Sequence, residues 1–298
     1  MLRDLVGLRV VAVHAHPDDE TIWTGGALAD FSQRGADVTV ITCTLGEQGE
    51  VIGEPFAQLV ADGADQLGGF RIGELAASLA ALGVRGEFLG GAGQWRDSGM
   101  IGDAANDNPR SFIHSGPAAE AQLTEVFNRL QPHLVITYGP DGGYGHPDHI
   151  RAHEITHRAA SQAQQPPQRI LWAVTSAPAL AEGLADIATI PHAWRRPQEG
   201  ELAAVDKHDA TLHLSDAAAA AKLRAMKAHP TQLWIADGDV NAVNPEAALA
   251  TLSSTEVAFA VFALSNLIAQ PLLRTEHYQL GAGTAIADVN SLTAGLSW

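Results

Sequence analysis

The sequence predicts an α/β fold built on a doubly wound, mainly parallel β-sheet. Two observations carry this prediction. Segments rich in β-branched and other apolar residues alternate along the chain with segments of helical periodicity, which is typical of a parallel sheet covered by helices. The strand-like segments are also apolar almost without interruption, as at residues 9–13 and 133–138, and this indicates strands that are buried on both faces.

The expected elements follow one another in a regular order. Strands are expected at residues 9–16, 37–44, 86–90, 133–139 and 169–176. Helical periodicity predicts helices near residues 22–34, 57–83, 117–131 and 147–163. After about residue 178 the alternation weakens, leaving an alanine-rich helical stretch at 216–228 and an apolar segment at 257–264. We therefore expect residues 1–177 to form the main region, and residues 178–298 to form a smaller C-terminal part packed on it or to continue the same domain.

Composition and charge exclude several classes of protein. With 18 basic and 34 acidic residues the formal net charge is −16, so neither nucleic acid nor an anionic membrane surface is expected as a partner. Asp4 and Arg9 interrupt the apolar residues near the N-terminus, and no segment approaches the roughly 20 apolar residues of a membrane span. We expect a cytoplasmic protein. Cys43, the only cysteine, lies in an apolar run and is expected to be a buried small hydrophobe.

Two short motifs follow predicted strands. Residues 15–20 read Ala-His-Pro-Asp-Asp-Glu, and residues 145–149 read Gly-His-Pro-Asp-His. Ligand sites of open parallel sheets form outside the carboxyl ends of the strands, so we expect both motifs to meet in one crevice. A Pro-Asp pair alone often only starts a helix, but helix capping explains the aspartates and not the histidines. The first strand-to-helix turn lacks the Gly-x-Gly-x-x-Gly fingerprint, which disfavours a nicotinamide cofactor.

The two motifs together predict a hydrolytic metal site. Zinc in such sites takes three protein ligands of imidazole and carboxylate type and keeps one position open. His16, Asp19 and His149 fit this count, although iron(II), cobalt or manganese would accept the same ligands. Asp18 is then free to act as a general base beside the metal.

Three neighbouring residues are expected to support this chemistry. His146 could help the leaving nitrogen to depart, either as an acid or electrostatically, and Asp148 could orient a histidine from behind. Tyr144 offers a hydroxyl to the developing oxyanion. A sugar-binding module with a structural metal is the non-enzymatic alternative, but structural sites are usually closed by four protein ligands.

A competing zinc-protease motif lies just downstream. Residues 153–157 read His-Glu-Ile-Thr-His and match His-Glu-x-x-His. Its metzincin extension fails because Ala160 stands where glycine is required, and no glutamate follows His157 until Glu182. We expect His153, Glu154 and His157 to bind no metal. His14 is expected to be a packed core residue, because it alternates with His16 along the strand.

The two His-Pro-Asp motifs resemble those of the LmbE-like family of zinc-dependent N-acetylglucosaminyl deacetylases, which share a Rossmann-like α/β fold. The resemblance covers residues 9–157 and returns at residues 263–266 and 276–278. It implies one zinc ion per subunit, or Fe²⁺ or another divalent metal, with His16, Asp19 and His149 as ligands. It also implies Asp18 as base, His146 as acid or electrostatic partner, and Tyr144 as oxyanion partner.

Within that family, residues 42–47, 66–75 and 89–100 look like the members that act in mycothiol biosynthesis. The resemblance implies hydrolysis of the acetamide of N-acetylglucosaminyl-inositol, a small-molecule glycoside, to glucosaminyl-inositol and acetate. The alternative is the related mycothiol S-conjugate amidase, which cuts a larger amide with the same metal motifs. The expected substrate contacts are Arg71, Asp97, Met100, Glu47 and Asn266. The simpler alternative is that these residues are ordinary polar and loop positions without a role in binding. The sequence gives no prediction of oligomeric state.

Overall fold

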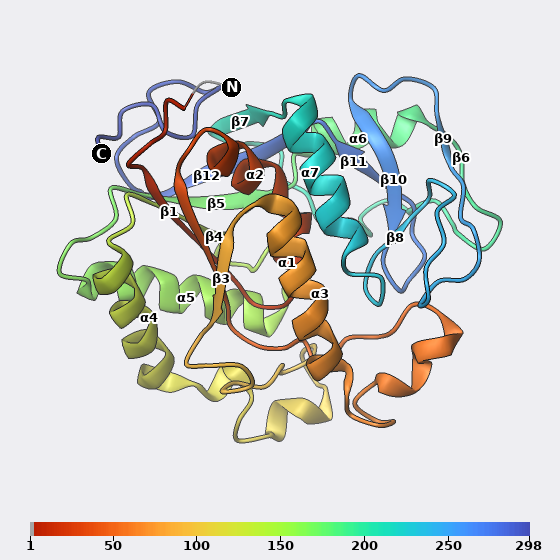
Figure 1. The fold of residues 1–298 in the computed structure, drawn as a ribbon, viewed down its shortest axis with the longest axis horizontal. Coiled ribbons are helices and arrows are strands. Elements are labelled where there is room, and N and C mark those ends of the chain that lie inside the picture. The colour runs from red at the N-terminus through yellow and green to blue at the C-terminus, as the bar shows by residue number, and fades with distance from the viewer. Residues whose placement is uncertain (1–2) are drawn as a thin grey trace.

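The computed structural model describes residues 3–298 and is centred on a seven-stranded sheet of order β3-β2-β1-β4-β5-β12-β7 (Figure 1). Strands β3, β2, β1, β4 and β5 are parallel, whereas β12 runs antiparallel to both β5 and β7. The order of the parallel strands is that of a doubly wound sheet, and the chain reverses its winding direction between β1 and β4. The expected fold class, an α/β Rossmann-like fold with a mainly parallel sheet, is thereby confirmed.

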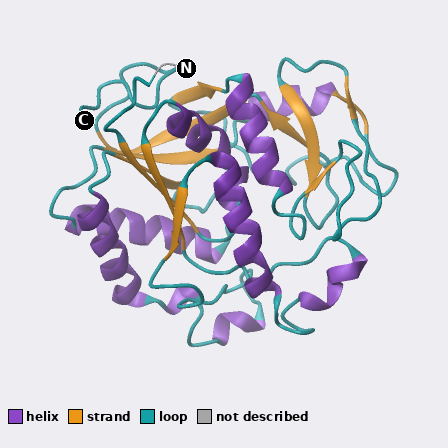
Figure 2. Ribbon diagram, viewed as in Figure 1, coloured by secondary structure: helices purple, strands orange, loops and turns teal. Residues whose placement is uncertain are grey.

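The central sheet has the following strands: β1 Arg9–His14, β2 Asp37–Thr42, β3 Arg85–Phe88, β4 Leu134–Tyr138, β5 Arg169–Val174, β7 Ala210–His213 and β12 Thr275–Gly283. The helices, shown in purple in Figure 2, are α1 Asp19–Ile22, α2 Gly25–Gln33, α3 Leu67–Leu82, α4 Gly116–Leu130, α5 Pro147–Gln162, α6 Ala177–Asp186 and α7 Asp216–Lys227, with short 3₁₀ turns at Glu54–Leu59, Ala104–Asp107 and Phe112–His114. Two small sheets contain β11 Gln270–Leu273, β10 Ala258–Ala263 and β8 Trp234–Ile235, and β6 Ile187–Thr189 with β9 Thr251–Leu252.

Helices cover both faces of the sheet because side chains alternate along each strand. In β1, Val10 and Ala12 face a core formed with α2 and α7, whereas Val11 and Val13 face a second core formed with α4 and α5. Figure 1 shows α4 and α5 on the side of the sheet away from α2, α3 and α7. Burial on both faces explains the apolar runs of β1 and β4, whereas the edge strand β3, Arg-Gly-Glu-Phe, is largely exposed.

Two of the expected helices are interrupted. The helix expected at 22–34 is divided into α1 and α2, which begins at Gly25. The helix expected at 57–83 is reduced to α3, because the chain forms a 3₁₀ turn at Glu54–Leu59 and Asp65 then takes a positive φ of 51°. At its other end α3 stops at Gly83, whose φ of 72° is the left-handed conformation that glycine adopts without penalty.

The C-terminal part returns to the central sheet. Strands β7 and β12 extend the sheet beyond β5, and α7 packs on α2 and α3. The expected helix at 216–228 is present as α7, begun by Ser215, whose hydroxyl accepts a hydrogen bond from the Ala218 N–H. The apolar segment at 257–264 forms β10. Within residues 3–298, none of the helices is both long and apolar enough to cross a membrane.

Candidate metal centre and active-site cavity

The two His-Pro-Asp motifs lie side by side because β1 and β4 are neighbours in the sheet. The first motif forms the turn from β1 into α1, and the second forms the loop from β4 into α5. Both turns leave the carboxyl ends of their strands at the point where the winding direction reverses. This is where ligands bind in doubly wound sheets.

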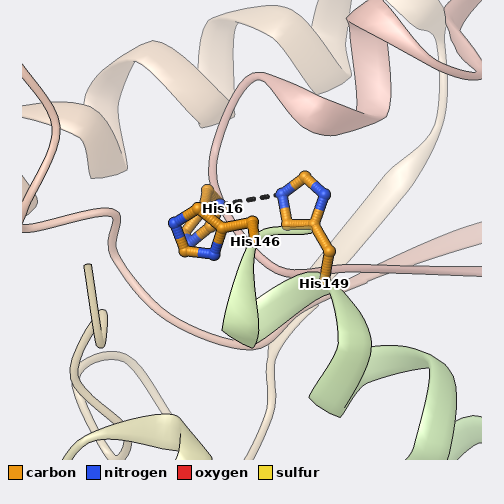
Figure 3. A group of neighbouring side chains, drawn as sticks. All are labelled: His16, His146 and His149. Atoms are coloured by element: carbon orange, nitrogen blue, oxygen red, sulfur yellow. Dashed lines mark hydrogen bonds between the residues drawn. The ribbon is translucent and has the colours of Figure 1, made fainter. Parts of the chain in front are cut away.

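Three side-chain atoms from the two motifs form a nearly equilateral triangle. His16 Nδ1 lies 3.3 Å from Asp19 Oδ2, His149 Nε2 lies 3.3 Å from the same oxygen, and the two nitrogens are 3.3 Å apart. Figure 3 marks the contact between His16 and His149 with a dashed line and shows His146 beside them. All three side chains of the triangle are buried.

The triangle fits a tetrahedral divalent ion. Ligands about 2.0–2.1 Å from such an ion lie about 3.3 Å from one another, so the three atoms can occupy one face of the tetrahedron. The trio occupies three of the four positions and leaves the fourth open, as in hydrolytic zinc sites. His146 also brings a nitrogen within 4.8 Å of His16 and His149, which makes it a neighbour of the same centre.

The groups behind both imidazoles favour the tautomer that metal binding requires. His149 Nδ1 is 3.1 Å from the carbonyl oxygen of Gly142, to which it can donate, and this leaves the Nε2 lone pair facing the triangle. His16 Nε2 lies 3.3 Å from Asp148 Oδ2 and 3.5 Å from Asp97 Oδ1, which leaves its Nδ1 lone pair facing the same point. Carboxylates and carbonyls placed behind histidine ligands in this way fix the ring and increase its basicity.

The electrostatic field of the site favours a cation. Burial disfavours the charged His16 ring, but the carboxylates of Asp97, Asp148 and Asp19 outweigh burial and raise the pKa of His16 well above its ordinary value. Three buried carboxylates around one imidazole therefore supply the negative potential that a divalent ion would neutralise.

Asp18 stands next to the triangle in an unusual backbone conformation. Its φ is 117°, a value that residues other than glycine rarely adopt. Its Oδ2 accepts a hydrogen bond of 2.9 Å from Arg71 Nη2, and Oδ1 has no hydrogen-bond partner within residues 3–298. Burial raises the pKa of Asp18 to about 6, although the Arg71 charge opposes the shift. This carboxylate therefore has one oxygen held and one oxygen available for proton transfer.

His146 and Tyr144 lie on the loop before α5. His146 is the N-cap of α5, and its Nδ1 accepts a hydrogen bond of 3.1 Å from the Asp148 N–H. The proton of the neutral ring therefore sits on Nε2. Burial lowers the pKa of His146 to about 3, assisted by the neighbouring His16 and His149. Tyr144 is half-exposed, with its ring centre 5.0 Å from that of His149.

A cavity of about 630 Å³ opens onto these residues. Of the expected substrate contacts, Arg71, Asp97, Met100 and Asn266 line it, together with Asp18, Tyr144 and His146. Glu47 lies behind the lining: its carboxylate accepts the Asp97 N–H at 3.0 Å, and its expected contact with substrate stays a prediction. The volume lies within the range of small-molecule sites.

The C-terminal part supplies a wall of this cavity that sequence reasoning did not resolve. The lining residues it contributes are Leu180, Glu201, Leu202, Ala203, Lys222, Gln232, Phe262, Leu264, Ser265, Asn266, Gln270, Pro271, Leu272, Leu273, Thr275, Glu276 and His277. Most of these come from short strands and loops with weak local patterns. In this part of the sequence, only residues 263–266 and 276–278 indicated a link to the active site, and they did so through the family resemblance.

The residues of the competing zinc-protease motif form hydrogen bonds and an ion pair with neighbouring residues. His153 Nδ1 lies 3.0 Å from the Tyr138 carbonyl oxygen, and His157 Nε2 accepts a hydrogen bond of 2.9 Å from Trp172 Nε1. Glu154 is exposed and pairs with Arg151. His14 is buried and bonded to Thr24, as expected of a core residue, and Cys43 is buried.

The chain is similar to one protein family and to several named proteins. Residues 11–160 match the model of the PIG-L family, described as GlcNAc-PI de-N-acetylase. A protein of Corynebacterium diphtheriae named 1D-myo-inositol 2-acetamido-2-deoxy-alpha-D-glucopyranoside deacetylase is 63% identical, with 99% of this chain and 100% of that protein covered. A protein of the same name from Corynebacterium glutamicum (strain R) is 65% identical over 96% of this chain and 95% of its own length.

A solved structure extends the comparison of the fold. The 4-carboxy-2-hydroxymuconate hydratase of Pseudomonas putida KT2440 matches with a TM-score of 0.51 and 17% identity. The match covers 94% of this chain and 99% of the hydratase. At this identity the similarity concerns the fold alone, because one fold hosts many reactions.

Proposed function

Because the chain belongs to the PIG-L family of de-N-acetylases, we propose that it is a zinc-dependent N-deacetylase of 1D-myo-inositol 2-acetamido-2-deoxy-α-D-glucopyranoside. The products are glucosaminyl-inositol and acetate, and the reaction belongs to mycothiol biosynthesis. The observation that carries the proposal is the 3.3 Å triangle of His16, Asp19 and His149, with the Asp18 carboxylate beside it. The names of relatives more than 60% identical over nearly their full length support the choice of substrate.

We propose Zn²⁺ as the bound ion, one per subunit, with Fe²⁺ as a possible replacement because histidine and carboxylate ligands accept both. A divalent ion held by His16, Asp19 and His149 would polarise the acetyl carbonyl and acidify the attacking water. Asp18 Oδ1 takes the proton of that water, because Arg71 already occupies Oδ2.

The remaining residues act on the charge that develops in the transition state. The Tyr144 hydroxyl donates to the oxyanion as the carbonyl carbon becomes tetrahedral. His146 turns its Nε2–H toward the departing nitrogen, because its Nδ1 is engaged by the Asp148 N–H. The amine then leaves with the proton that Asp18 has collected, while the neutral His146 ring assists as a hydrogen-bond donor.

Substrate contacts follow from the cavity lining. Arg71 and Asp97 line the cavity and face the sugar hydroxyls with the donor and acceptor positions that are not used within the protein, and Met100 offers an apolar contact at the exposed edge. Asn266 brings an amide from the opposite wall. Glu47 contributes by holding the Asp97 backbone, and its contact with the inositol is part of the proposal.

The direct test measures primary-amine release from N-acetylglucosaminyl-inositol by zinc-loaded protein, beside its Asp18→Ala and Glu154→Ala variants. We expect release by the wild type and by Glu154→Ala, and a loss of roughly 10²–10⁴-fold in Asp18→Ala. Release that depends on Glu154 would point to the protease motif instead. No release from this substrate, with cleavage of a mycothiol S-conjugate, would identify the related amidase.

A further inference from the structure

A buried chain of hydrogen bonds connects the end of α7 with the backbone of Asp18. It begins at His229, just beyond α7, passes through the carboxylate of Glu20 in α1, and ends at the Asp18 N–H. His229 and Asp18 are more than 200 residues apart in the sequence, and His229 belongs to neither His-Pro-Asp motif and takes no part in the proposed reaction.

Asp18 needs such support because its backbone is strained. With φ at 117° and ψ at −33°, this non-glycine residue occupies a sparsely populated conformation that persists only when its surroundings hold it. The Asp18 N–H donates to Glu20 Oε2 at 2.9 Å. The orientation of Glu20 therefore fixes the turn from which the Asp18 carboxylate projects.

The other oxygen of Glu20 is held from two further elements. His229 Nε2 lies 2.8 Å from Glu20 Oε1, and the Ser78 hydroxyl in α3 donates to the same oxygen. Both His229 and Glu20 have no exposed surface. Within residues 3–298 the contact with Glu20 is the only hydrogen bond of the His229 side chain, because its buried Nδ1 has no partner.

The position of His229 is itself well fixed. Two residues further on, Thr231 donates from its backbone N–H and its hydroxyl to the two oxygens of Glu74 in α3, at 2.9 and 2.7 Å. Glu20, Ser78 and His229, which form this chain of hydrogen bonds, lie behind the cavity wall, since none of them lines the cavity. They therefore act on the reaction indirectly, through the turn into α1 that carries Asp18.

We propose that His229 is a positioning residue: through Glu20 it holds the strained turn that directs the Asp18 carboxylate toward the metal centre. The effect on turnover rests on the proposed function. The effect on the Asp18 backbone does not depend on which substrate is used.

The kinetic test compares His229→Ala, His229→Gln and a control, His157→Gln, which alters a histidine bonded to Trp172 away from the cavity. For His229→Ala we expect kcat to fall about tenfold or more, with KM within about twofold and one zinc per chain retained. His229→Gln should recover part of kcat, because its amide N–H can reach Glu20. The control should stay within about twofold of the wild type. A rise in KM alone, or no difference between the alanine and glutamine variants, would overturn the proposal.

A second readout separates this proposal from the proposed function. Hydrogen–deuterium exchange of peptides covering residues 15–22 should show faster exchange of the Asp18 amide in His229→Ala than in the wild type or in His157→Gln. Should His229→Ala fail to fold, Ser78→Ala removes the other donor to Glu20 Oε1 and should give the same direction of change. Unchanged exchange in the folded variants would refute the role of His229 even if the enzyme is active. If the wild type releases no amine, the proposed function fails, and the exchange result still decides this inference.

Discussion

Arg71 holds one oxygen of the Asp18 carboxylate at 2.9 Å, and the same guanidinium donates to the carbonyl oxygens of Pro17 and Gly46. The arginine is almost fully buried, and it joins α3 to the turns after β1 and β2. One side chain thus fixes both the carboxylate and the backbone of the turn that carries it. Loop residues with catalytic roles gain their precision from such fixed supports.

We predict that Arg71→Lys lowers kcat by about tenfold or more, because a single ammonium cannot replace the planar fork that reaches Asp18 and two carbonyls. Steady-state amine release measures the change in kcat, and a thermal melt measures any accompanying change in stability. Gly46→Ala provides an independent perturbation, since a Cβ at Gly46 would collide with the Arg71 guanidinium. Wild-type activity in both variants would show that Arg71 does not position Asp18.

Metal content should separate the ligands from their neighbours. We predict that Asp19→Ala and His149→Ala lose most of the bound zinc, because each removes one corner of the 3.3 Å triangle. His146→Ala should retain the metal while losing activity. Inductively coupled plasma mass spectrometry on dialysed protein gives the result. Zinc lost from His146→Ala but retained by Asp19→Ala would replace the triangle by the cluster of three histidines.

The buried pair of Lys222 and Glu276 should contribute to stability. Glu276 Oε1 accepts from Lys222 Nζ at 2.6 Å, and its two oxygens also accept the N–H groups of Gly26 and Ala27 at the start of α2. Glu276→Ala leaves the buried Lys222 ammonium with the Ile22 carbonyl but no carboxylate, and two helix N–H groups without their acceptor, so we predict a loss of about 3–5 kcal/mol in urea unfolding. Replacing both partners, as Lys222→Met with Glu276→Gln, should cost less than Glu276→Ala alone. A larger loss in the double variant would contradict this account.

Stability should fall in mild acid partly because of His277. Burial, with the neighbouring His208, lowers the pKa of His277 to about 4, below the value of about 6.5 expected in the unfolded chain. Between these values the unfolded state binds more protons, so stability present above about pH 6.5 is lost as the pH falls toward 4. His213, Lys222 and Glu276 also act on this ring.

We therefore predict that His277→Gln loses less stability than the wild type between pH 7 and pH 4.5, measured as the urea midpoint. The exposed His192 offers a matched control, and His192→Gln should follow the wild type. Parallel pH dependence of wild type and His277→Gln would exclude this histidine as a contributor.

Local sequence patterns were sufficient for the parallel half of the sheet. Strands β1, β2, β4 and β5 are rich in β-branched and other apolar residues and are mostly buried on both faces. Such segments can be recognised as strands from their own residues. The break between α1 and α2 was missed: Thr24 leaves the helical conformation before Gly25, and Glu276, 250 residues away, accepts the N–H groups of Gly26 and Ala27. The strands β7 and β12 were also missed, since β7 is only four residues long and β12 is exposed over part of its length.

By itself, the sequence determined the fold class and the two motifs from which a metal site can be built. Both can be recognised locally, because a buried strand and a set of metal-ligand side chains each occupy a short stretch of residues. Only the tertiary structure decided which atoms meet: the 3.3 Å triangle, the Arg71 contact with Asp18, and the wall that the C-terminal part adds to the cavity. The same holds for the link from His229 through Glu20. These contacts join residues tens to hundreds of positions apart, and their geometry is set by packing and buried hydrogen bonds rather than by any local pattern.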